Sequence, residues 1–370
     1  MPHHLALLAL RRLRHPHPRP LLRQLAQRGW HRVAPWLPWV GVVLLLALLL
    51  QAAPPWEMKA ALDRADLRLT LPVLACTLGS LVLRAMRWHL LVQAIAAPNS
   101  LLDSLLLYTA AQAALLIPGG QFLLPVLQRS QHGTLIRRSA ATILVQELVW
   151  GLLVLPAALP GIPEYHPAGW LLLISFVFNV GTSVALLHGD LMRLILRLLR
   201  HVPFLRHHTG HLAELQLHFG TIAGSRAAIL GSLLDMAAIG LLGLAFYFAL
   251  QAVGAAHLGW IDGLAVYSLG AAVGTISALP GGLGATEDIS TLVLTRLGLT
   301  PGTAAAATLL FRAANVLIGS ALGWLVLVLG ARRMNVHPSI GGLIRAVRGA
   351  QAHVEGGTPI HRPPERALQE

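Results

Sequence analysis

Apolar runs separated by short polar segments dominate the chain. About six of them are long enough to cross roughly 30 Å of hydrocarbon as helices, and they cover about 36–53, 69–97, 139–160, 167–188, 226–253 and 302–330. Two further runs, about 101–127 and 262–299, each contain a Pro-Gly-Gly break. The pattern predicts an all-α membrane protein, a polytopic helical bundle of about eight apolar segments.

The two breaks interrupt their apolar runs at points too deep for ordinary loops. They read Ile117-Pro118-Gly119-Gly120 and Leu279-Pro280-Gly281-Gly282. A proline removes a backbone donor, and paired glycines let the chain reverse without side-chain clash. In hydrocarbon, such a break persists only where protein or a water-filled cavity satisfies the freed backbone groups. One broken helix in each half of a membrane protein is typical of a transporter site.

Arginines set the predicted orientation. Segments 161–166 and 254–260 carry no Arg or Lys. The arginines instead flank the apolar runs in four groups: Arg11 to Arg32, Arg129 to Arg138, Arg193 to Arg206, and Arg332 to Arg348. Because positive loops stay on the cytoplasmic side, we expect all four groups and both termini in the cytoplasm.

This orientation constrains the two broken runs. The run 101–127 would begin and end on the cytoplasmic side, and 262–299 would begin and end on the outer side. Each Pro-Gly-Gly would then form the tip of a re-entrant hairpin, one from each face. The prediction is therefore six full spans and two re-entrant hairpins with a candidate inverted repeat. Alternatively, each broken run is one kinked span or two short ones.

We expect three regions along the chain. Residues 1–35 form a basic cytoplasmic N-terminal segment, and residues 36–330 form the transmembrane domain. Residues 331–370 form a basic cytoplasmic tail, whose Pro, Gly and charge content is typical of disorder.

Within the transmembrane domain, 191–219 differs from the spans. Arginines recur there at helical spacing beside leucines, as in a helix lying along the membrane surface. Three histidines follow, but no acidic or cysteine partner stands at ligand spacing, so we expect a solvated cluster and no metal. They are His207, His208 and His211.

Composition supports the membrane class. The chain is 55% hydrophobic and 12% charged, and its mean hydropathy is +0.65. A net charge of +13 is not accompanied by a nucleic-acid motif, so a cytoplasmic membrane face explains it better. The single cysteine, Cys76, excludes an intrachain disulfide. No nucleophile, metal or nucleotide motif is found, and we expect neither a cofactor nor an enzyme.

Charged residues inside the spans are the candidate functional groups. Each costs about 2.5–3.5 kcal/mol on insertion scales, so each needs a partner or a purpose. Arg312 could form a structural ion pair with Glu287 or Glu147, or bind a phosphate through its planar fork. Arg84 and Arg87 are further candidates for substrate binding, or they snorkel to the cytoplasmic interface. Asp235 joins Glu147 as a candidate for proton coupling.

The second break also begins a predicted helix. Its exposed N–H groups and positive helix end would favour an anion. No Gly-Lys-Ser/Thr follows, so the segment is not a P-loop. We therefore expect substrate contacts from both breaks and the residues just after the second, namely Pro118, Gly119, Gly120, Pro280, Gly281, Gly282, Gly284 and Glu287.

These residues resemble a known family. The segments Leu279 to Glu287 and Leu309-Leu310-Phe311-Arg312 resemble motifs of the flippase-like integral membrane family named for the lysylphosphatidylglycerol synthase transmembrane region. Arg84-Ala-Met-Arg87-Trp88 resembles an earlier segment, and Ile117 to Gly120 the first hairpin. The resemblance spans roughly 36–330. It implies a bundle with two re-entrant hairpins in a bacterial inner membrane and lipid transfer between leaflets.

The sequence departs from that family at two places. Relatives usually continue the first hairpin with polar and acidic residues, whereas Gln121-Phe122-Leu123-Leu124-Pro125 follows here. No aminoacyl-transferase domain fits after about residue 335, so we do not expect lysyl transfer by this chain alone. The implied substrate is a phospholipid, a polyprenyl-linked lipid or a hopanoid-type lipid.

Three functions are compatible with these features. The leading prediction is a lipid flippase or transporter that binds an anionic, phosphorylated or lipid-linked headgroup. A second is an integral-membrane transferase acting on a lipid-linked substrate, which usually needs a metal pair or a nucleophile and base. A third is a non-transporting membrane partner of a cytoplasmic or membrane lipid-biosynthesis enzyme, recruited through 191–219. A homo-oligomer is compatible with each, and no nucleic-acid partner is expected.

Overall fold

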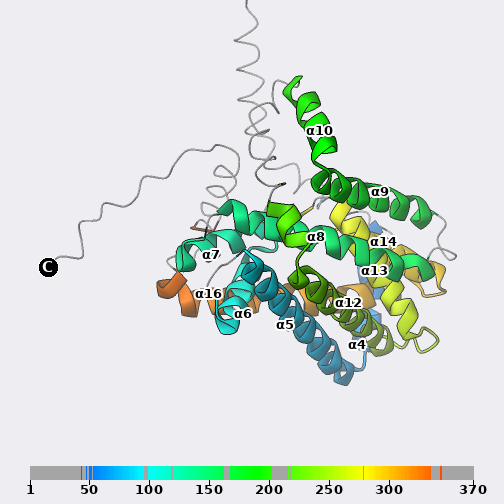
Figure 1. Ribbon diagram of the computed structural model, residues 1–370. Helices are drawn as coiled ribbons and strands as arrows, with labels where there is room; N and C mark the ends of the chain where they lie inside the picture. Colours follow the sequence, from blue (N-terminus) through cyan, green and yellow to red (C-terminus); the bar gives the residue numbers. More distant parts are fainter. Residues whose placement is uncertain are drawn as a thin grey trace, which may run out of the picture.

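The computed structural model describes the central part of the chain with short gaps. The described residues are 43, 47, 50, 51, 53–95, 99–117, 120–134, 136–161, 167–201, 216, 218–277, 279–334 and 342–343. Helices and short helical turns make up their regular structure, without a strand among them (Figure 1). The predicted all-α class is confirmed.

Five helical stretches are long and apolar enough to cross a membrane. They are Leu67–Ala94, Arg138–Gly161, Gly169–Leu187, Arg226–Ala252 and Pro301–Ala331. These stretches match five of the six predicted spans and confirm a multi-pass membrane protein. The remaining predicted span, 36–53, lies almost wholly outside the described residues, so the count of six stays a prediction.

Helix α12 (Arg226–Ala252) packs along α5 (Thr70–Ala94) and is the centre of the bundle. Gly231 lies against Arg87 and Leu91, whereas Gly79 lies against Leu241 further along the pair. This order shows that α5 and α12 run antiparallel. Their glycines carry no Cβ, so the two backbones approach closely, as is typical of helix pairs in membranes.

The other face of α12 packs against α13 (Trp260–Ser277) in the same way. Gly243 of α12 faces Leu264, and a Cβ on Gly243 would lie 2.8 Å from the Leu264 Cα atom. Gly263 of α13 in turn faces the backbone of Tyr247. The two helices therefore also run antiparallel, with a glycine from each at the interface.

The first broken run consists of short helices. These are α6 (Leu101–Ala111), the 3₁₀ turns η3 (Gln112–Ala114) and η4 (Gly120–Phe122), and α7 (Leu123–His132). Eleven residues of α6 reach only about 16 Å, too short to cross the hydrocarbon. Asn99 and Gln128, before α6 and within α7, exchange amide hydrogen bonds of 2.8 and 2.6 Å in a buried site. The two ends of this run are therefore held together.

The second broken run also joins two helices through a turn, but its first helix is longer, with 18 residues. Helix α13 leads through the turn η7 (Pro280–Gly282) into α14 (Ala285–Arg296). Gly281 and Gly282 have φ of 58° and 66°, which glycine adopts without strain. Gly270 faces Thr286 and Ser290 across the interface, and Gly274 faces Thr286. The helices on either side of this break therefore run antiparallel.

The last long helix changes its winding near its middle. Helix α15 (Pro301–Arg312) continues through a π-helical segment, η8 (Ala313–Ile318), into α16 (Gly319–Met334). Such π segments inside α-helices occur frequently at functional sites. Gly323 of α16 packs against the backbone of Gln112 and Ala113. This helix therefore touches the first broken run as well as carrying Arg312.

The structure describes part of 191–219, the segment predicted to lie along the membrane surface. Helix α10 (Gly189–His201) follows α9 (Pro167–Leu187) and projects from the bundle in Figure 1. Its Arg193 and Leu198 are exposed. Residues 202–215, with the three histidines, lie outside the described residues. So do the N-terminal segment 1–35 and all of the tail except 331–334 and 342–343.

The α12–α13 interface gives a first testable prediction. Gly243→Ala should lower the free energy of unfolding in detergent by about 1–3 kcal/mol, because the new Cβ meets the Leu264 backbone. Gly240→Ala, on the same helix with nothing within 4 Å, is the matched control and should leave stability unchanged or higher. Equal thermal unfolding of the two variants would contradict the packing described here.

Candidate functional site

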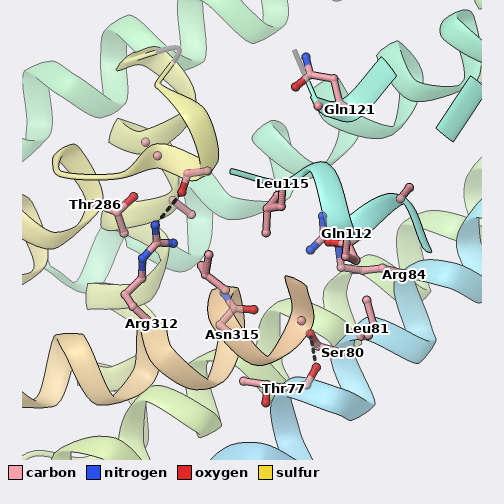
Figure 2. A pocket seen from close by; sticks show the side chains of 18 of the residues that line it. Thr77, Ser80, Leu81, Arg84, Gln112, Leu115, Gln121, Thr286, Arg312 and Asn315 are labelled. Carbon is pink, nitrogen blue, oxygen red and sulfur yellow. Dashed lines mark hydrogen bonds between the residues drawn. The ribbon is translucent and has the colours of Figure 1, made fainter. Parts of the chain in front are cut away.

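Both Pro-Gly-Gly breaks open onto one cavity of about 540 Å³ (Figure 2). Ile117 and Gly120 contribute from the first break, and Gly281 and Gly282 from the second. Much of the remaining lining is polar: Thr77, Ser80, Arg84, Tyr108, Gln112, Gln121, Gln146, Glu147, Thr275, Thr286, Arg312 and Asn315. A cavity of this size and polarity, inside an otherwise apolar bundle, suits a small polar ligand or headgroup.

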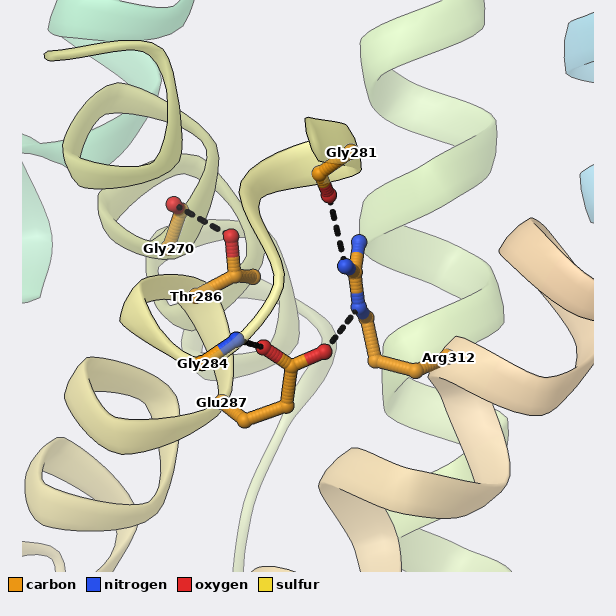
Figure 3. A network of polar contacts seen from close by, with 6 residues as sticks. All are labelled: Gly270, Gly281, Gly284, Thr286, Glu287 and Arg312. Carbon is orange, nitrogen blue, oxygen red and sulfur yellow. Dashed lines mark hydrogen bonds and ion pairs between the residues drawn. The ribbon is translucent and has the colours of Figure 1, made fainter. Parts of the chain in front are cut away.

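Arg312 ties the second break to the last long helix (Figure 3). Its Nε atom donates to Oε1 of Glu287 at 2.6 Å, and its Nη2 atom donates to the Gly281 carbonyl at 2.7 Å. The Glu287 side chain is 3% exposed and that of Arg312 is 11% exposed. The structural ion pair, one of the two alternatives for Arg312, is therefore present, and it includes the backbone of the break.

Glu287 also completes the start of α14. Its Oε2 atom accepts a 2.7 Å hydrogen bond from the Gly284 N–H, where φ is 83°. Both oxygens of this carboxylate are thus engaged, one by the backbone and one by Arg312. A helix N-terminus favours a negative charge, so the carboxylate also complements the helix dipole. The anion expected at this helix start is supplied by the protein itself.

Thr286 holds α14 against α13. Its hydroxyl donates to the Gly270 carbonyl at 3.2 Å, as Figure 3 shows. A Cβ on Gly274 would lie 2.5 Å from the same hydroxyl oxygen. The small residues of α13 therefore make room for Thr286, which positions the Glu287 end of α14 beside Arg312.

Arg84 is the second cation of the cavity. Its guanidinium carbon lies 4.9 Å from the ring centre of Trp150 and 5.9 Å from that of Tyr108. Its Nε atom is buried without a hydrogen-bond partner. Within the described part of the chain, Arg84 makes no ion pair. The aromatic rings position this charge without neutralising it.

Arg87 has a different environment, although it lies only three residues further along α5. It is 1% exposed and forms an ion pair with Asp235, which is fully buried. Both residues border a void of about 10 Å³ and are not part of the large cavity's lining. Burial at this depth excludes the snorkelling alternative for Arg87. The structure therefore separates the two arginines and pairs Asp235 with one of them.

The remaining predicted site residues also divide into those that line the cavity and those that do not. Glu147 lines the cavity, is exposed, and makes no hydrogen bond or ion pair with another described residue. Gly284 and Glu287 are not among the lining residues, although Glu287 binds Arg312 of the wall. Pro280 lies in the turn η7, whereas Pro118 and Gly119 lie outside the described residues. In the described ranges, no three His, Cys, Asp or Glu side chains group as they would around a metal ion.

Sequence reasoning missed the uncharged polar lining. Thr77, Ser80 and Arg84 lie three and seven residues apart on α5, so they share one helix face. This spacing within an apolar span could have predicted a polar face on this helix. Gln112, Gln121, Gln146 and Asn315 come from different segments, and only the fold brings them to one cavity.

The comparison with protein families supports the resemblance noted in the sequence. The family described as the lysylphosphatidylglycerol synthase TM region matches residues 36–323, which is more than half of the chain. The protein therefore belongs to this family, and a lipid-related role in the membrane is consistent with that membership. A search of curated proteins finds no match.

The buried Arg87–Asp235 pair gives a second prediction. Asp235→Leu should lower the free energy of unfolding by about 3–5 kcal/mol, because Arg87 would remain buried without a counter-charge. The double variant Arg87→Leu/Asp235→Leu should recover most of this loss. Thermal unfolding in detergent measures both.

Asp63→Asn provides the control for this pair. It breaks the exposed Lys59–Asp63 ion pair, and exposed pairs contribute little. If Asp235→Leu changed the free energy of unfolding as little as this control does, Arg87 and Asp235 would not form the buried ion pair that the structure shows.

Proposed function

We propose that this protein moves a lipid with a phosphate-containing headgroup between the leaflets of a bacterial inner membrane. The observation that carries the proposal is the polar cavity formed where the two broken runs meet inside an apolar bundle. Membership of the lysylphosphatidylglycerol synthase TM family supports a lipid substrate. The acyl or prenyl chains would remain in the bilayer, so only the headgroup needs polar surroundings.

In this proposal the two broken runs are re-entrant hairpins. The Asn99–Gln128 pair joins the ends of the first run, and His257 Nε2 lies 3.4 Å from the Leu297 carbonyl at the ends of the second. Ends that meet favour a run that enters and leaves on one side. With cytoplasmic termini, the first hairpin opens to the cytoplasm and the second to the outside. Alternate movement of the two tips would expose the cavity to each leaflet in turn.

Transport is favoured over a transferase reaction by the state of the acidic residues. Glu287 and Asp288 are the adjacent carboxylates at the site, and Glu287 has both oxygens in hydrogen bonds to Arg312 and Gly284. A carboxylate engaged in this way is poorly available as a metal ligand or general base. A recruitment role through α10 would leave the polar cavity without a purpose.

The hairpin topology can be tested with single cysteines, since Cys76 is the one native cysteine. In a Cys76→Ser background, Leu101→Cys and Gln131→Cys should react with an impermeant maleimide from the cytoplasmic side. His257→Cys and Arg296→Cys should react from the outer side. Labelling of the two members of either pair from opposite sides would show one kinked span in place of a hairpin.

The transport activity can be measured in liposomes that carry fluorescent phosphatidylglycerol and the purified protein. Dithionite stays outside the liposomes, so we expect it to reduce the inner-leaflet fluorescent lipid faster than in protein-free liposomes, because the protein moves that lipid to the outer leaflet. Gly282→Val should reduce this rate about tenfold, because a side chain at φ 66° is strained and its Cβ would lie 2.7 Å from the Thr286 hydroxyl.

Gly181→Ala is the matched control for this assay. It lies on α9 with nothing within 4 Å of the added Cβ, so its transport rate should equal that of the wild type. No acceleration by the wild-type protein for any phosphate-containing lipid tested would overturn the proposed function.

A further inference from the structure

We infer that Arg84, and not Arg312, is the residue that binds the anionic group, and that Glu147 restricts it to a single negative charge. The ligand class is a phosphodiester. Arg312 instead holds the wall of the cavity in place. This inference rests on the proposed function and assigns the substrate contact within the same site.

Arg312 has little charge to offer a ligand. Its Nε and Nη2 atoms are occupied by Glu287 and by the Gly281 carbonyl. The carboxylate at 2.6 Å neutralises the guanidinium, and both partners are almost fully buried. An incoming phosphate could reach only the remaining N–H groups of Arg312, and it would meet a guanidinium whose charge Glu287 already balances. Arg312 therefore offers a phosphate less net attraction than an arginine without a carboxylate partner.

Arg84 has the opposite character. It and Arg312 are the cationic side chains among the described cavity-lining residues, and Arg84 alone of the two lacks a carboxylate partner. Figure 2 shows the two arginines on opposite sides of the cavity, with Arg84 beside Gln112. The rings of Tyr108 and Trp150 limit the positions of its guanidinium. A cation held in one position, unpaired and facing a polar cavity, is suited to bind a phosphate oxygen.

Glu147 limits the charge of the ligand. Its carboxylate lines the same cavity and has no ion-pair partner among the described residues. The charges of Arg84 and Glu147 cancel, and Glu287 balances Arg312, so the side chains around the cavity have no net charge. A phosphodiester brings one negative charge, whereas a phosphomonoester brings close to two at neutral pH. Repulsion by Glu147 therefore disfavours the monoester, because its second negative charge would lie in the same cavity as this carboxylate.

Amide groups around Arg84 fit the uncharged part of such a headgroup. Gln146 has a buried Oε1 atom without a hydrogen-bond partner, and it lines the cavity next to Glu147 on α8 (Ile136–Ala158). Gln112 lines the cavity from the first broken run, and Asn315 lines it from η8 of the last long helix. Side-chain amides such as those of Gln112 and Asn315 can donate hydrogen bonds to hydroxyl groups of the headgroup and accept them.

The test is native mass spectrometry of the purified full-length protein in detergent containing phosphatidylglycerol, a phosphodiester lipid. Arg84→Gln should retain this lipid about tenfold less than the wild type, since a charge-assisted hydrogen bond is lost. Arg84→Lys should retain an intermediate amount, which separates loss of charge from misfolding. Arg64→Gln, at an exposed position outside the cavity, is the matched control and should bind as the wild type does.

The double variant Glu287→Gln/Arg312→Gln removes both charges of the wall while keeping an acceptor for the Gly284 N–H. We expect it to retain phosphatidylglycerol within about threefold of the wild type, with a slower transport rate in the liposome assay. Loss of lipid retention in this variant, together with wild-type retention in Arg84→Gln, would overturn the assignment while leaving the proposed function intact.

Glu147→Gln tests the charge restriction with phosphatidic acid, a phosphomonoester lipid. The wild type should prefer phosphatidylglycerol, and the variant should retain phosphatidic acid about tenfold better than the wild type does. An unchanged preference would overturn the role of Glu147.

Dimethyl phosphate, a soluble phosphodiester, in a thermal-shift assay separates the two sources of the anion. Protection by dimethyl phosphate that is lost in Arg84→Gln, without lipid retention by the wild type, would support Arg84 as the anion site and overturn the lipid part of the proposed function. No binding of either probe by the wild type would overturn both.

Discussion

The contact between Arg312 and the second break is the interaction that joins this break to the last long helix. A chain interrupted inside hydrocarbon has carbonyl and N–H groups that neither water nor a helix can satisfy. Here the Gly281 carbonyl accepts from Arg312, and the Gly284 N–H donates to Glu287. One ion pair therefore satisfies both sides of the break and fixes α14 against the last long helix. Without it, the Gly281 carbonyl and the Gly284 N–H would be unpaired.

The same constraint explains how charge is arranged in the bundle. Arg87 with Asp235, and Arg312 with Glu287, form ion pairs at positions that are almost fully buried. Arg84 and Glu147 are not paired, and both line the cavity. Charges that stabilise the fold, Arg312 in the cavity wall included, are thus neutralised within the protein, whereas Arg84 and Glu147 are left for a ligand or for water. Only 12% of the residues are charged, and the four charges around the cavity thus serve either the fold or the site.

Glycine has two separate roles in the architecture. At Gly281, Gly282 and Gly284 it supplies positive φ angles at the second break. At Gly243 and Gly263 it lets α12 and α13 approach until each glycine meets the backbone of the other helix. Close packing around the breaks gives the short helices α6, α7 and α14 neighbours that compensate for their length. The cavity is therefore bounded by closely packed elements, although part of its wall comes from broken helices.

The sequence by itself determined the membrane class, five of the spans, the two breaks and the family. Span length and hydrophobicity are local properties, and proline with paired glycine acts on the backbone wherever it stands. Only the tertiary structure decided which charges pair. Arg84 and Arg87 lie in the same apolar span, and nothing in the sequence distinguishes their roles. In the structure Arg84 lines the cavity, whereas Arg87 of the same helix pairs with Asp235 of α12. The amide lining was also hidden, because Gln112, Gln146 and Asn315 are distant in sequence and meet only when the helices pack.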